Sequence, residues 1–184
     1  KDEERLDEIL DRSRRNAETN IKRNKDLLDE SRENVKENIK KNEDLARRIR
    51  ERVEDLERKV KDKDLLKEIR DILREIEKVV EDSIRRIREM LRRDEKLVKD
   101  SIDEIRRVLK RVEDLVEDVK RRLRDEELVK RVEDELRRLN EEVNKISEEM
   151  LKRSKDTVRE LNKVSEDALR KLDELRERIE RRTT

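Results

Sequence analysis

The chain has 184 residues, of which 59% are charged, and its 55 Lys and Arg nearly cancel its 54 Asp and Glu to a net charge of +1. It contains no Cys, His, Gly, Pro, Phe, Trp or Tyr, which excludes disulfides, thiolate or imidazole metal sites, glycine-rich phosphate loops and aromatic base-stacking platforms. The two signs of charge are interleaved rather than separated, so a basic nucleic-acid surface is not expected.

Helical spacing of the apolar residues runs through almost the whole chain. Leu66, Ile69, Leu73 and Ile76 show the pattern, with apolar residues three and four positions apart, as on one face of an amphipathic helix. This regularity argues against the disorder that so high a charge content could otherwise indicate. Without Gly or Pro the chain has few residues that end helices. The sequence therefore predicts an all-α fold.

The first predicted helix covers about residues 2–60. Its apolar face carries asparagines at four-residue spacing, which places their side chains one above the other on a helix. Asparagine is a poor helix former and is costly to bury without a partner, so this repeated use requires an explanation. The asparagines form two groups, Asn16, Asn20 and Asn24, and then Asn34, Asn38 and Asn42.

The second predicted helix covers about residues 63–123, after a joint at 61–63 where Asp62 can cap it. An 18-residue repeat, which is five helical turns, carries Ile84 onto Ile102 across residues 93–95. Only a continuous helix has reason to keep this phase. The alternative is an extra break near 93–95, which gives four helices, two long and two short. The continuous helix leaves Asp94 as a lone acid on the apolar face, with no evident role.

The third predicted helix covers about residues 126–182, after a joint around 124–126 where Asp125 can act as the cap. A period of 18 residues lies close to the natural helical repeat, so the helices should run nearly straight. Two short joints make neighbouring helices antiparallel. We therefore expect a long antiparallel three-helix bundle, nearly untwisted, that forms a single domain over residues 1–184.

In such a bundle, polar residues of the three helices fall at common levels. Asn and Ser can satisfy each other's hydrogen-bonding groups, and buried polar layers disfavour misregistered packing. Alternatively, some asparagines are flanking or exposed, a reading that fits Asn16, Asn34 and Asn140 best, or they line a functional polar pocket. The expected first polar layer is Asn20, Asn24, Ser101, Asn144 and Ser147, and the second is Asn38, Asn42, Ser83, Asn162 and Ser165.

No residue pattern indicates chemistry. Carboxylates such as Glu148 and Glu166 belong to charged helix faces, whereas a general acid or base needs a pocket that displaces its pKa. Serine nucleophiles lack a His base, and carboxylate di-metal bundles need Glu-x-x-His pairs. We expect no catalytic residue, no metal site, no cofactor and no small-molecule substrate.

Together these features resemble those of de novo designed helical bundles with buried Asn and Ser hydrogen-bond networks. The resemblance covers the whole chain and rests on an alphabet of twelve residue types, the 18-residue repeats, the Glu, Lys and Arg surfaces and the Asn and Ser layers. It implies a soluble, stable scaffold, either a monomer or a homo-oligomer. Joints without Gly or Pro, and only three alanines, depart from the commonest designs.

The expected function is therefore structural, namely a designed scaffold without enzymatic activity. The alternative is a helical interaction module that completes its bundle with another copy or with a partner helix, since only 30% of the residues are apolar. No apolar run approaches the ~20 residues of a membrane span. We expect no nucleic-acid or membrane partner, no natural location, and a soluble, cytoplasmic protein when it is expressed in cells.

Overall fold

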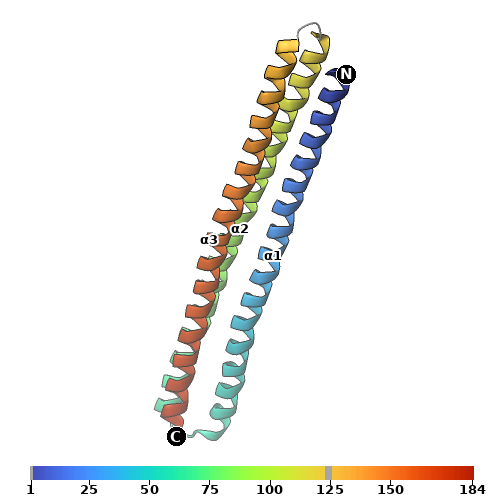
Figure 1. Ribbon diagram of the computed structural model, residues 1–184. Coiled ribbons are helices and arrows are strands. Elements are labelled where there is room, and N and C mark those ends of the chain that lie inside the picture. The colour runs from blue at the N-terminus through green and yellow to red at the C-terminus, as the bar shows by residue number, and fades with distance from the viewer. Residues whose placement is uncertain (1, 123–125) are drawn as a thin grey trace. The chain divides into compact units, whose positions relative to one another are not determined.

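The computed structural model describes residues 2–122 and 126–184, which form three α-helices (Figure 1). These are α1 (Asp2–Lys59), α2 (Lys63–Arg121) and α3 (Glu126–Thr183). All helix ends lie within two residues of the predicted ones, and the three helices pack as a bundle. Asp125, the expected cap of the third helix, lies outside the described residues.

Helix α2 runs without interruption through residues 93–95. The four-helix alternative is therefore wrong, and the conserved 18-residue phase is the correct guide. Asp94 resembles a cap in sequence, but its side chain is only 2% exposed and lies on the inner face of the helix. Its backbone has no reason to leave the helical conformation, because neither Gly nor Pro stands nearby.

Asp62 caps the start of α2, as its position in the sequence predicts. Its Oδ1 accepts hydrogen bonds from the backbone N–H groups of Asp64, at 3.0 Å, and Leu65, at 3.4 Å. These two groups belong to the first turn, whose amides have no partner within the helix. A short joint of residues 60–62 therefore suffices to end α1 and begin α2 without glycine.

The packing divides the chain into two compact units, each made of segments from all three helices. Unit 1 comprises residues 1–30 and 94–155, and unit 2 comprises residues 31–93 and 156–184. The single domain expected over 1–184 stays a prediction. In unit 1, α1 and α3 run parallel, because Arg5 pairs with Glu133 and the later Asn20 bonds the later Asn144.

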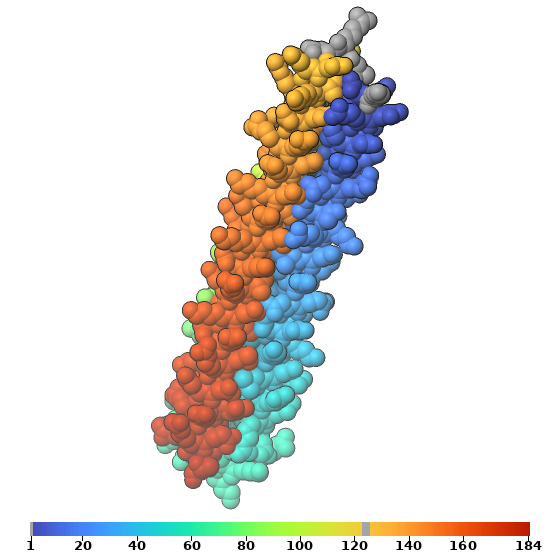
Figure 2. Space-filling view, in the orientation of Figure 1, coloured from blue at the N-terminus to red at the C-terminus, as the bar shows by residue number. Residues whose placement is uncertain are grey.

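Unit 1 has a large and a small apolar cluster. The large one is rich in valine, which the α2 segment supplies from Val108 to Val119 and the α3 segment from Val129 to Val143. The small one contains only three buried residues, Val98, Ile102 and Met150. Figure 2 shows side chains of α1 and α3 meeting on the face turned to the viewer.

Unit 2 has the same division. Its larger cluster runs along α1 from Ala46 to Leu56 and includes Leu172 and Leu175 of α3. Its smaller cluster has four buried residues, which are Val35, Ile87, Leu161 and Val164. Each unit thus has one large and one small apolar cluster.

Candidate functional site

The first polar layer contains one side chain that bonds to both other helices. Asn24 of α1 donates from Nδ2 to Ser101 Oγ of α2 at 2.9 Å, and its Oδ1 accepts from Ser147 Oγ of α3 at 3.1 Å. Asn24 and Ser147 are both 0% exposed. One carboxamide in unit 1 therefore uses its donor and its acceptor on two different neighbours.

Asn20 lies one turn before Asn24 and faces α3. Its Nδ2 donates to Asn144 Oδ1 at 3.1 Å, and also to the backbone carbonyl and Oδ1 of Asn16, at 2.9 and 3.3 Å. Asn20 is buried, but Asn144 is exposed. The first layer therefore extends from the core of unit 1 to its surface.

The second polar layer, in unit 2, uses a different acceptor. Asn162 Oδ1 of α3 accepts from both Asn34 Nδ2, at 2.8 Å, and Asn38 Nδ2, at 2.9 Å. All three residues are partly buried. The reading of Asn34 as merely flanking is therefore wrong, because it has a direct partner on α3. Its place one turn before Asn38 is the signal that could have indicated this bond.

Asn42 repeats the position of Asn24 but not its bonds. Its Nδ2 donates to Ser165 Oγ at 3.0 Å and to the Asn38 carbonyl at 2.8 Å, whereas its buried Oδ1 has no hydrogen-bond partner. Ser83 is buried, yet its hydroxyl donates to the Val80 carbonyl of its own helix at 2.9 Å. Ser83 therefore does not donate to the asparagines of α1, although its level places it among them.

Several buried polar residues were not assigned to either layer. Ser13, Ser31, Ser154 and Asp94 are each at most 3% exposed, and their side-chain oxygens have no hydrogen-bond partner. Glu133 is also buried, and it pairs with Arg5 at 2.9 Å. All of these stand at helical spacing among apolar residues, a signal that sequence reasoning used for Asp94 but not for the others.

Asn16 and Asn140 are the other two asparagines that the alternative reading takes as flanking or exposed. Both are partly buried. Asn16 accepts from Asn20, but its own Nδ2 is buried without a partner. Asn140 lines a small cavity of about 200 Å³ between α1 and α3 of unit 1, together with Arg5 and Glu133.

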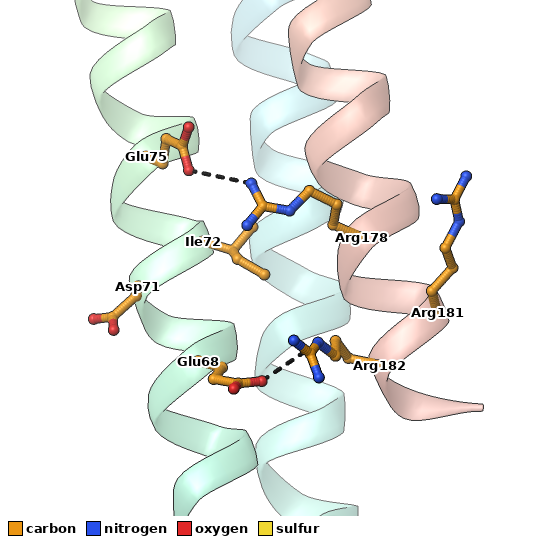
Figure 3. A pocket seen from close by; sticks show the side chains of 7 residues that line it. All are labelled: Glu68, Asp71, Ile72, Glu75, Arg178, Arg181 and Arg182. Atoms are coloured by element: carbon orange, nitrogen blue, oxygen red, sulfur yellow. Dashed lines mark ion pairs between the residues drawn. The ribbon is translucent and has the colours of Figure 1, made fainter.

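A surface groove of about 390 Å³ lies between α2 and α3 of unit 2 (Figure 3). Glu75 faces Arg178 across it at 3.6 Å, and Glu68 faces Arg182 at 3.5 Å, over a floor formed by Ile72. The four charged side chains are about half exposed. Asp71 of α2 and Arg181 of α3 also line the groove, on opposite sides of the two ion pairs.

The groove presents no net charge and no enclosed polar site to a ligand. Its three acidic and three basic residues carry formal charges that cancel, and exposed ion pairs of this kind contribute about 0–1 kcal/mol each. The groove therefore has the chemistry of a charged helix surface. The carboxylates considered for acid–base work, Glu148 and Glu166, are likewise exposed.

Metal ligands do not gather among the described residues, where no group of three or more acidic side chains is placed to hold an ion. Within the same residues, no helix combines the length and apolar character that crossing a membrane requires. No protein-family model, curated protein or solved structure matches this chain.

Proposed function

We propose that this protein is a designed structural scaffold, without a natural biochemical activity, in which buried Asn and Ser side chains set the register of the helices. The supporting observation is the carboxamide of Asn24, which bonds Ser101 and Ser147 at once. A slip of either neighbouring helix by one turn, about 5.4 Å, breaks such bonds and leaves polar groups buried without partners. Misregistered packing then costs several kcal/mol.

The test replaces this three-helix bond set by apolar residues, in the variant Asn24→Leu, Ser101→Ala and Ser147→Ala. Replacing all members together leaves no unpaired partner, so the free energy of unfolding should stay equal or rise. At the same time, the register of α2 and α3 against α1 should become less well defined. Because the chain has no cysteine, spin labels on cysteines introduced at the exposed Arg12 and Lys110 can report the distance between α1 and α2 of unit 1.

In the chain with the unsubstituted layer, we expect one narrow distribution of the distance between the two spin labels. In the variant, we expect a broad distribution or several distances. The matched control makes the same kinds of change at exposed neighbours, with Lys25→Leu, Glu104→Ala and Glu148→Ala. It should keep the narrow distance. A variant that also keeps it would show that the layer does not set register.

The second candidate is a helical interaction module, in which another copy of the chain or a partner helix packs beside α1 and α3. Two observations favour it. Asn16 Nδ2 is buried without a hydrogen-bond partner, and Asn144, which bonds Asn20, is exposed. If the Asn16 side chain turns outward, an added helix can accept from its Nδ2 and also cover Asn144.

Sedimentation at increasing concentration separates the two candidates. A scaffold that needs no copy of itself sediments as one species of 22.7 kDa throughout. If copies associate through Asn16, a species larger than 22.7 kDa should appear as the concentration rises. The variant Asn16→Ala should reduce the fraction of that species at each concentration. Mixing the chain with a synthetic peptide of residues 126–183 tests the partner-helix form, for which binding must also fall in Asn16→Ala.

A further inference from the structure

Asp94 is the one acidic residue among the described ranges whose two carboxylate oxygens are both buried without a hydrogen-bond partner. The side chain is 2% exposed. It begins the α2 segment of unit 1. A carboxyl group in this state has lost its hydration without gaining protein hydrogen bonds, which is among the most costly arrangements in a protein interior.

Ser154 of α3 belongs to the same region of unit 1. Asn24 joins Ser101 of α2 to Ser147 of α3 at one level, and these helices run antiparallel, so seven residues back on α2 and seven forward on α3 reach a second common level. Those positions are Asp94 and Ser154. The Ser154 hydroxyl is 0% exposed and also lacks a partner.

The apolar cluster beside these two residues has few fully buried side chains. The small cluster beside them has three buried residues, Val98, Ile102 and Met150, and partly buried side chains such as Leu97 and Leu151 pack against it. The α2 segment beyond it, from Ile105 to Val119, belongs to the large cluster, which contains twelve buried residues. Two parts of one helix in the same unit therefore differ both in apolar burial and in unpaired polar groups.

We propose that α2 of unit 1 opens locally at residues 94–102, while residues 105–116 remain packed, and that Asp94 sets the ease of this opening. Opening hydrates the Asp94 carboxyl and the Ser154 hydroxyl, which recovers solvation that the closed state lacks. It breaks the small cluster, whose buried residues are few, and the hydrogen bond from Asn24 to Ser101. Helices commonly fray from their ends, but here the unpaired Asp94 carboxyl and the small cluster lie in the interior of a 59-residue helix.

Native-state hydrogen exchange tests this proposal on the intact chain. Amide protection at residues 95–102 should be about tenfold or more lower than at 105–116. Exchange at 95–102 should also depend little on low concentrations of denaturant, because a local opening exposes little surface. Equal protection and equal denaturant dependence in the two segments would overturn the proposal.

The variant Asp94→Val should raise protection at residues 95–102 by about tenfold or more, toward that of 105–116. Asp94→Ala, which cannot overpack, should raise it in the same direction. The matched control is Asp100→Val, the same exchange at an exposed position of the same helix, which should leave the protection of 95–102 unchanged. Unchanged protection in both Asp94 variants, or an equal rise in the control, would refute the role of Asp94.

Discussion

Asn24 and Asn42 occupy equivalent positions 18 residues apart, yet their carboxamides bond differently. Asn24 has a partner for its donor and for its acceptor, whereas Asn42 uses both donor hydrogens and leaves Oδ1 buried and unpaired. The serines on both neighbouring helices differ: on α3, Ser147 donates to Asn24, whereas the equivalent Ser165 accepts from Asn42. Ser101 accepts from Asn24, but Ser83 turns its hydroxyl to Val80. Equal residues at equal levels therefore need not form equal networks.

This difference predicts unequal costs for two serine substitutions. Ser147→Ala removes the donor to Asn24 Oδ1 and leaves that oxygen buried, so it should lower the free energy of unfolding by about 1–3 kcal/mol. Ser83→Ala removes only a bond to the Val80 carbonyl within its own helix, and alanine is the better helix former, so the change should be under about 0.5 kcal/mol. Denaturant titration measures both. Equal losses would contradict the contacts described above.

At the scale of the helices, ion pairs at the surface connect α1 to α3 in unit 2. Arg52 Nε donates to Glu180 Oε1 at 2.9 Å, and its Nη2 reaches Oε2 at 3.4 Å. Arg52 also donates to Asp55 of its own helix at 3.1 Å. The hydrogen bond from Arg52 lowers the pKa of Glu180, and a hydrogen bond from Lys59 lowers the pKa of Asp55.

The lowered pKa of Glu180 predicts a pH-dependent contribution to stability. Since the folded-state pKa lies below the ordinary value of 4.5, the contribution is fully present above that value and is lost as the pH falls through the folded pKa. Both side chains are 42% exposed, so the effect should be small. The melting temperature of the unsubstituted chain should exceed that of Glu180→Gln near neutral pH, and the gap should close in acid.

Glu180→Gln keeps the shape of the side chain and leaves Asp55 with its partners, so the titration of Asp55 contributes equally to both proteins. A gap that stays constant from neutral to acid pH would contradict the assignment to Glu180. Asp173→Asn, at another exposed ion pair of α3, provides a comparison of the same chemical kind.

For the whole molecule, the sequence predicts helix number, order and ends well because one signal, the helical period of apolar residues, extends over long segments. The 18-residue repeat of apolar positions, which keeps its phase across residues 93–95, alone predicts that α2 is continuous there. Hydrogen-bond partners were less predictable. The level of Ser83 follows from the register, but the rotamer that turns its hydroxyl to Val80 depends on local packing. Likewise the buried Asn42 Oδ1 has no signature in the sequence.

The charge pattern of the whole chain predicts a weak dependence of stability on salt. Among residues 2–122 and 126–184, most ion pairs described join residues three or four apart on one helix and are largely exposed, such as Arg85 and Glu89, with side chains 62% and 46% exposed. Such pairs contribute little and are screened at high ionic strength, whereas burial of apolar surface is not. The melting temperature should therefore fall by only a few degrees between about 0.05 M and about 1 M NaCl. Unfolding in ~1 M NaCl at room temperature would show that ion pairs dominate.

The uninterrupted phase of α2 also determines how its length can change. An insertion or deletion of 18 residues adds or removes five full turns and returns every later side chain to its original direction, whereas 16 or 20 residues would rotate them by about 160°. Near residues 93–95, such a rotation would turn Val98 and Ile102 outward and bring charged side chains inward. The 18-residue period is therefore the natural unit for lengthening or shortening this helix.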